Sequence, residues 1–201
     1  MLAQLRGAIA GGVDAVQIRE PGLAAREYIQ FIRAAVALPR PTGCRILVND
    51  RLDLAVAGGA DGIHLRESSI PVSITRRFVD AVGSDARRML VGRSVHDTRT
   101  AVLVRSADYM IAGSVFETES KPGRHASLGL DGLREVVRAA EGCPVWAVGG
   151  VTPDRVASVL DTGARGVAAI GAFLPIRGST SIERDVQAVT EALRLLLDRH
   201  S

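Results

Sequence analysis

One short pattern occurs four times in this chain and restricts the folds that it can adopt. In each copy a helix ends at a small residue, and a short apolar strand begins within a few residues. The copies are residues 12–19, 59–66, 106–113 and 163–170. They recur about every 50 residues, which leaves room for one further strand and helix between neighbouring copies. Because short apolar strands that alternate with amphipathic helices are typical of parallel sheets, the pattern predicts an α/β fold.

Hydrophobic periodicity predicts where each element lies. We predict strands at residues 14–18, 44–48, 61–65, 89–92, 108–113, 144–148 and 166–170. We predict helices at residues 2–10, 23–37, 51–57, 73–82, 97–105, 130–141, 153–162 and 180–198. A closed barrel of this kind begins with a strand, whereas residues 1–4 have helical character. We therefore predict a (β/α)8 TIM barrel whose first strand is absent from the chain.

Length and composition fit a single domain over residues 1–201. The chain is 47% hydrophobic and 23% charged, which is enough to bury a sizeable core. It has no apolar run of membrane-spanning length and no signal-peptide pattern at its N-terminus, so we expect a cytoplasmic protein without a membrane partner. Cys44 and Cys143 each lie where a strand begins, and we predict that both are buried free thiols.

The identity of the basic residues, Lys or Arg, is more informative than their number. A net charge of +3 with dispersed basic residues does not favour a nucleic-acid partner. Lys121 is the only lysine among 25 Lys and Arg residues, and it lies in the loop at 118–123. A compact ammonium can approach a phosphate where a planar guanidinium does not fit, so we predict that Lys121 binds phosphate. Chance placement of the one lysine is the alternative.

Polar residues follow the predicted strands, where parallel barrels carry their chemistry. Hydrogen-bond donors at these strand ends indicate an anionic, phosphorylated ligand. The donors are Arg19, Asn49, Thr118, Ser120 and Lys121. Asp50 is a candidate metal ligand, although one carboxylate is a poor magnesium site without phosphate oxygens. For any single residue, solvation of a loop end is the alternative explanation. Triad hydrolysis, zinc chemistry and hydride transfer are disfavoured, because their motifs do not stand out in the sequence.

Two consecutive predicted strands end in glycine. Gly149 and Gly150 follow the strand at 144–148, and Gly171 follows the strand at 166–170. Backbone N–H groups at glycine turns can reach phosphate oxygens directly, so we predict a phosphate site here. Thr152 is the predicted N-cap of the helix after the first turn. The alternative is that these glycines only form the turns between strand and helix.

Motifs along nearly the whole chain resemble the thiamine phosphate synthase and TenI superfamily. The motifs are residues 17–20, 48–51, 62–65, 92–96, 115–118, 120–123 and 148–150, in the family's order. The resemblance implies a (β/α)8 barrel and an enzyme of thiamine biosynthesis. The synthase of this family joins a pyrimidine diphosphate to a thiazole phosphate and releases pyrophosphate.

The resemblance also implies a role for each strand end. Gln17 and Arg19 would face the pyrimidine. The implied pyrophosphate ligands are Asn49, Ser94, Thr118, Ser120 and Lys121. The implied ligands of the thiazole phosphate are Gly149, Gly150, Ile170 and Gly171. In the synthase, Asp50 would be a ligand of Mg²⁺.

Two positions depart from the synthase pattern. Pro21 stands where the synthase has a lysine after the Arg-Glu pair, and residues 68–69 are serines near the synthase's second acidic metal ligand. These departures resemble the TenI branch, a thiazole phosphate tautomerase. The histidine that TenI has before Val115 is Ser114 here, so His96 and His64 are further candidates for proton transfer.

We therefore predict first a TenI-like tautomerase that needs no cofactor, with His96, Lys121 and Ser114 as candidate catalytic residues. The first alternative is a thiamine phosphate synthase that needs Mg²⁺, in which Glu67 would have to serve the metal. The second is a non-catalytic regulatory barrel that binds phosphorylated ligands. Phosphorylated thiazole is the expected ligand, together with the pyrimidine diphosphate in the synthase. A homo-oligomer stays open as an alternative to a monomer.

Overall fold

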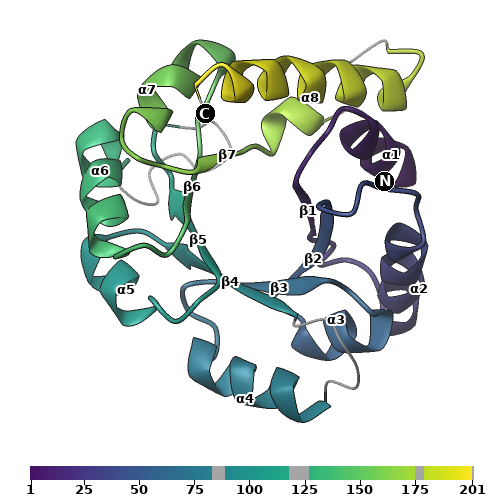
Figure 1. Cartoon of the computed structure of the whole chain (residues 1–201). Helices are drawn as coiled ribbons and strands as arrows, with labels where there is room; N and C mark the ends of the chain where they lie inside the picture. Colours follow the sequence, from purple (N-terminus) through teal and green to yellow (C-terminus); the bar gives the residue numbers. More distant parts are fainter. Residues whose placement is uncertain (83–88, 118–126, 175–178, 201) are drawn as a thin grey trace. The chain divides into compact units, whose positions relative to one another are not determined.

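The computed structural model describes residues 1–82, 89–117, 127–174 and 179–200 (Figure 1). The chain groups into two compact units. The first unit comprises Met1–Val91 and Ala172–Arg194, and the second comprises Gly92–Gly171 and Leu195–Ser201. We describe each unit by itself, and the single domain over 1–201 stays a prediction.

The first unit alternates helices with parallel strands. Its elements are α1 (Leu2–Ala10), β1 (Ala15–Ile18), α2 (Ala25–Val36), β2 (Arg45–Asn49), α3 (Leu52–Gly58), β3 (Gly62–Leu65) and α4 (Val72–Val82), and α8 (Ile182–Asp198) begins in it. Strand β1 pairs with β2 in parallel, with Ala15 opposite Arg45. Strand β2 pairs with β3 in parallel, with Leu47 opposite Gly62. The carboxyl ends of these three strands therefore lie along one edge.

The second unit repeats the same alternation. Its elements are β4 (Leu90–Val95), which starts in the first unit, α5 (Thr98–Leu103), β5 (Tyr109–Gly113), α6 (Gly129–Ala139), β6 (Val145–Val148), the 3₁₀ helix η1 (Pro153–Arg155), α7 (Val156–Leu160) and β7 (Gly166–Ala168), and the 3₁₀ helix η2 (Gly171–Phe173) follows. Strands β4 to β7 pair in parallel in chain order. The parallel strands of both units confirm the predicted α/β class.

The core of the first unit lies between its strands and the helices α2 and α3, which cover the same side of them (Figure 1). Ile32 of α2 and Ile46 and Val48 of β2 are completely buried. A Cβ atom on Gly58 would lie 2.4 Å from Cγ2 of Ile32, so only glycine lets α3 approach α2 this closely. Full burial of each large aliphatic side chain contributes about 1.5–3 kcal/mol.

The core of the second unit includes an aromatic pair. Tyr109 of β5 and Trp146 of β6 pack edge to face, with ring centroids 5.6 Å apart. The Tyr109 ring covers Gly92 of β4, where a Cβ atom would lie 1.9 Å from Cζ of the ring. Burial raises the pKa of Tyr109. Gly92 therefore has a packing reason to be glycine.

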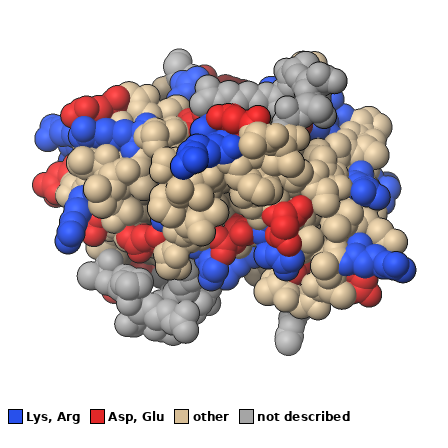
Figure 2. All heavy atoms as spheres, turned by 90° about the horizontal axis from the view of Figure 1, so that it is seen from below, with Lys and Arg blue, Asp and Glu red and all other residues tan. Residues whose placement is uncertain are grey.

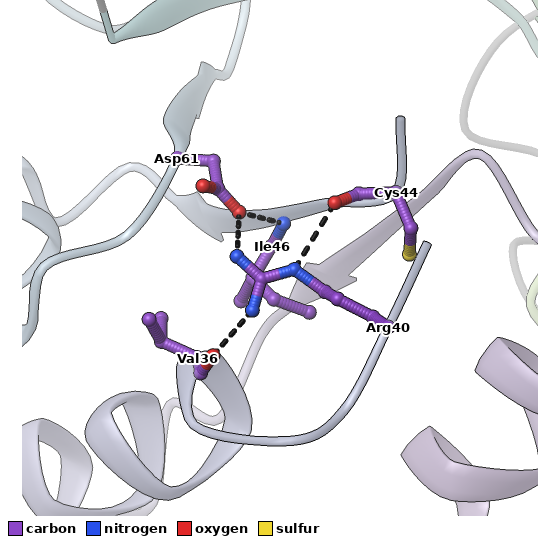
Figure 3. A network of polar contacts seen from close by, with 5 residues as sticks. All are labelled: Val36, Arg40, Cys44, Ile46 and Asp61. Carbon is purple, nitrogen blue, oxygen red and sulfur yellow. Dashed lines mark hydrogen bonds and ion pairs between the residues drawn. The ribbon is translucent and has the colours of Figure 1, made fainter. Parts of the chain in front are cut away.

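A polar network joins the amino ends of β2 and β3 (Figure 3). The Asp61 carboxylate accepts hydrogen bonds from Nη2 of Arg40 (2.8 Å) and from the backbone N–H of Ile46 (2.7 Å). The Arg40 guanidinium also donates to the carbonyl oxygens of Cys44 (3.1 Å) and Val36. Because chemistry in parallel barrels lies at the other ends of the strands, we assign this network to stability.

Most element boundaries differ from the prediction by one or two residues, and the differences at β4, β7 and the helix after β6 lie near the predicted site. Strand β4 continues to Val95 rather than ending at residue 92, and β7 ends at Ala168 rather than at residue 170. The helix predicted at 153–162 begins as the 3₁₀ turn η1, where Thr152 is the N-cap but makes no side-chain capping hydrogen bond. The described residues open on α1, so their first strand is β1, as predicted.

Both cysteines are free, as predicted. Cys44 is buried, whereas Cys143 is only half-buried because it lies in the turn before β6, and this corrects the prediction for Cys143. Burial raises the pKa of both thiols. Neither thiol is therefore activated as a nucleophile.

Figure 2 shows how charged side chains are distributed over one face. On the face drawn in Figure 2, basic and acidic side chains are interspersed, and neither sign forms one continuous area. Among the described residues, no helix combines the length and the apolarity needed to cross a bilayer.

Candidate functional site

The ends of β1 and β2 bring two predicted site residues together in the first unit. Nε2 of Gln17 donates a hydrogen bond to Oδ1 of Asn49 over 3.0 Å. This bond orients the Asn49 amide and leaves its NH₂ group as the donor toward a ligand. Arg19 lies just beyond β1 and is exposed. The structure therefore pairs Gln17 with Asn49 and places Arg19 at the same strand end.

Asp50 follows β2 in an unusual backbone conformation, with φ of 59°. Its backbone N–H donates to the carbonyl oxygen of His64 in β3 over 2.9 Å. This bond holds the turn after β2 against the neighbouring strand. His64 itself is a buried residue of β3, with only 3% of its surface exposed, so it does not lie at a solvent-facing edge.

The Asp50 carboxylate is held by two side chains that follow β3. Ser69 donates its hydroxyl proton to Oδ1, and Nε of Arg66 donates to Oδ2 over 2.6 Å. Nη2 of Arg66 forms an ion pair with the same Oδ2 atom. Burial alone would raise the pKa of the Asp50 carboxyl, but the hydrogen bonds from Ser69 and Arg66 and the Arg66 charge outweigh it and hold that pKa below its usual value.

The second unit contains His96 and Ser94. Ser94 is half-buried in β4, and His96 lies just after that strand. Nδ1 of His96 is within hydrogen-bonding distance of the carbonyl oxygen of Gly113 at the end of β5. A ring nitrogen that binds a carbonyl oxygen must donate, so Nδ1 carries the proton and Nε2 is the nitrogen that can accept one.

The loops after β5 and β6 run side by side. The backbone N–H of Phe116 donates to the carbonyl oxygen of Gly149 over 3.0 Å. Gly149 and Gly150 have φ of 97° and 64°. A Cβ atom on Gly149 would lie 2.7 Å from Cβ of Ser114, and one on Gly150 would lie 2.7 Å from the carbonyl oxygen of Glu117. Chain packing thus explains both glycines, and their contact with phosphate stays a prediction.

The end of β7 differs from the end of β6. Gly171 has no atom within 4 Å of the position of a Cβ atom, and its φ lies outside the left-handed region. Ile170 lies beyond the end of β7 and is 68% exposed. Neither packing nor backbone conformation therefore requires glycine at position 171.

Two arginine interactions were not predicted from the sequence. Nη1 of Arg155 donates to the carbonyl oxygen of Gly150 over 2.8 Å, and its guanidinium lies 4.4 Å from the centroid of the Phe116 ring. Arg155 thereby fixes the turn after β6. The pairing of Arg66 with Asp50 was also missed, because it depends on the register of β2 against β3.

Three predicted ligands, Thr118, Ser120 and Lys121, lie outside the described residues, and their roles stay predictions.

In the described part of the chain, no group of three or more His, Cys, Asp or Glu side chains could hold a metal ion. The Asp50 carboxylate, the predicted metal ligand, is already engaged by Arg66 and Ser69.

Comparisons with known proteins point to one family. Residues 1–173 match the family described as thiamine monophosphate synthase. A thiamine-phosphate synthase from Moorella thermoacetica is 37% identical over 198 residues, which cover 98% of this chain and 89% of that protein. One from Natronomonas pharaonis is 41% identical over 173 residues, which cover 84% of this chain and 78% of that protein.

A solved structure of a thiamine phosphate pyrophosphorylase from Pyrococcus furiosus is also similar, with a TM-score of 0.81 and 31% identity. The likeness covers 98% of this chain and 89% of the other. Together with the seven strands of the described residues, it confirms the predicted fold class, a (β/α)8 TIM barrel. The names of these relatives favour the synthase, our first alternative, over the tautomerase that we predicted first.

Proposed function

The chain belongs to the thiamine monophosphate synthase family, and on this basis we propose that it is a thiamine phosphate synthase. It would join a pyrimidine diphosphate to a thiazole phosphate and release pyrophosphate. The observation that carries the proposal is the 37% identity over 198 residues to a protein named as this enzyme. The proposal replaces the TenI-like tautomerase.

The site of a synthase must stabilise the negative charge of the leaving group. As the bond to the diphosphate breaks, negative charge accumulates on the departing pyrophosphate. Donors that are already fixed in place lower the barrier, because they need no reorganisation when the charge develops. The Asn49 amide, oriented by Gln17, is such a donor. Lys121 stays a predicted phosphate ligand.

Magnesium is the cofactor that the family resemblance implies. The described residues around Asp50 do not fit it, because Arg66 forms an ion pair with this predicted ligand and Ser69 binds its other oxygen. A divalent ion on Asp50 would lie beside a guanidinium charge. We therefore derive no step of the reaction through a metal.

The test is a product assay with two substrate mixtures. The full chain is incubated with the pyrimidine diphosphate, the thiazole phosphate and MgCl₂, and thiamine phosphate is measured. A parallel sample receives thiazole carboxylate phosphate and is assayed for its isomer. Thiamine phosphate formed at an enzymatic rate supports the proposal. Formation of the isomer without thiamine phosphate contradicts the proposal and supports the tautomerase. Stabilisation of the fold by the ligand, without formation of either product, contradicts it as well and supports the regulatory barrel.

A matched pair of glutamine variants connects the assay to the site. Gln17→Ala removes the side chain that orients Asn49, so we expect kcat/KM to fall by roughly 10-fold or more. Gln187→Ala is the control, because Gln187 is a half-buried residue of α8 whose side chain donates to Glu191 over 2.9 Å, far along the chain from the strand ends. Equal activity of the two variants would remove the Gln17–Asn49 pair from the proposed site.

A further inference from the structure

The turn after β3 places the guanidinium of Arg66 against the carboxylate of Asp50, which is the predicted metal ligand. Arg66 follows directly after Leu65, the last residue of β3, and two of its guanidinium nitrogens contact Oδ2 of Asp50. Ser69, three residues later, donates to Oδ1. Both carboxylate oxygens therefore accept hydrogen bonds from side chains of the same turn.

The cluster of Asp50, Arg66 and Ser69 is largely buried at Asp50 and exposed at Arg66. The Asp50 side chain is 17% exposed, and its backbone N–H is bonded to β3. The Arg66 side chain is 58% exposed. A guanidinium carries five N–H donors, and the contacts with Asp50 use only Nε and Nη2. The carboxylate thus anchors one edge of the guanidinium, while Nη1 makes no hydrogen bond or ion pair with the described residues and can serve another partner on the solvent side.

We propose that Arg66 takes the place of a divalent cation at this strand end and binds the diphosphate group of the substrate directly. A guanidinium presents N–H donors in a plane that matches two phosphate oxygens, and it carries the charge that a bound metal would otherwise supply. The Asn49 amide, immediately before Asp50, lies at the same end of β2 and adds a donor. The identity of the ligand as a diphosphate rests on the proposed function.

The consequence is that diphosphate binding does not depend on Mg²⁺. Inorganic pyrophosphate is the probe, and its binding to the full chain is measured by isothermal titration calorimetry in EDTA and in MgCl₂. We expect the two dissociation constants to agree within about threefold, because the charge on Arg66 is permanent. Loss of more than about 10-fold in affinity in EDTA would overturn the proposal.

Variants of Arg66 test the residue itself. In EDTA, Arg66→Ala should weaken pyrophosphate binding by at least about 10-fold, and Arg66→Lys by less, because an ammonium keeps the charge but not the planar fork. Arg51→Ala is the matched control, since Arg51 is also exposed and pairs with the carboxylate of Asp53. Equal weakening by Arg51→Ala would indicate a general effect of charge and would contradict a specific role for Arg66.

A double variant tests whether a divalent cation can take the place of Arg66. Arg66→Ala combined with Ser69→Asp removes the guanidinium and adds a second carboxylate at the position that contacts Asp50. It should bind pyrophosphate in MgCl₂ but not in EDTA, whereas binding in both media would contradict the proposal. Pyrophosphate binding does not require turnover, so a chain that binds it through Arg66 but forms no thiamine phosphate would contradict only the proposed function. Circular dichroism checks that each variant is folded.

Discussion

At the scale of single residues, Asp50 combines an uncommon backbone conformation with two strong side-chain partners. Its carboxyl has a lower pKa in the folded chain than in the unfolded chain. A carboxyl of this kind stabilises the fold above its unfolded pKa, near 4, and the contribution is lost as the pH falls through the lower folded pKa. Asp50 should therefore contribute to stability at neutral pH and not in strong acid.

Asp50→Asn tests this dependence. At neutral pH we expect the variant to be about 1–2 kcal/mol less stable than the parent, since hydrogen bonds to a charged group contribute on this scale. In acid, at a pH below about 4, the difference should shrink, because the parent carboxyl becomes protonated as the pH falls through its lowered pKa. Urea unfolding at both pH values is the measurement. A difference that stays constant with pH would show that the Asp50 charge is not responsible.

Two glycines that sequence analysis treated alike are expected to behave differently. Gly149→Ala forces a side chain into φ of 97° and places its Cβ atom 2.7 Å from Cβ of Ser114, so we expect a loss of about 2–4 kcal/mol. Gly171→Ala meets open space and should change stability by less than about 0.5 kcal/mol. Thermal unfolding of both variants is the check. Similar melting temperatures would contradict the packing argument for Gly149.

At the scale of elements, the Arg40 network shows how the amino ends of two strands are fixed. Arg40→Ala leaves the Asp61 carboxylate, whose side chain is only 7% exposed, without its ion-pair partner. We expect a loss of about 2–4 kcal/mol in the free energy of unfolding. Arg51→Ala removes an exposed pair with Asp53 and should cost less than about 1 kcal/mol. Chemical denaturation compares them, and equal losses would place the Arg40 network among ordinary surface pairs.

The elements show what the sequence could predict. The local sequence was sufficient to predict the bounds of α1, Leu2–Ala10, without knowledge of its tertiary partners. The end of β4 was missed because Arg93 and Ser94 are polar, and only tertiary packing makes a strand of them. At the site, Gln17 and Asn49 could be predicted at one edge from strand order alone. The Arg66 contact with Asp50 could not, because it depends on the conformation of two turns.

At the scale of the whole molecule, the first and last helices of the described chain pack against each other (Figure 1). A Cβ atom on Gly7 of α1 would lie 2.2 Å from the carbonyl oxygen of Glu183 in α8, and Arg194 of α8 donates to Asp14 over 2.8 Å. The two helices approach to backbone contact because α1 carries glycine at this point. The contact joins segments from opposite ends of the sequence.

Gly7→Ala should separate these helices. Although alanine favours an isolated helix, we expect a loss of about 2–3 kcal/mol here because backbone atoms of α8 cannot yield as a side chain can. Gly22→Ala is the control, since no atom lies within 4 Å of its Cβ position. The measurement is the melting temperature of each variant, Gly7→Ala and Gly22→Ala, compared with that of the parent. An unchanged value for Gly7→Ala would mean that α8 can shift without loss.

The contact between α1 and α8 has a consequence for synthesis on the ribosome. Helix α1 emerges before α8, so the part of α1 around Gly7 and Gly11 has no packing partner until Glu183 and Thr190 have been translated. During elongation this part of α1 therefore lacks its native contact, and the first unit is completed only in a late, long-range step. Nascent chains arrested before α8 should accordingly be the species that chaperones and proteases engage.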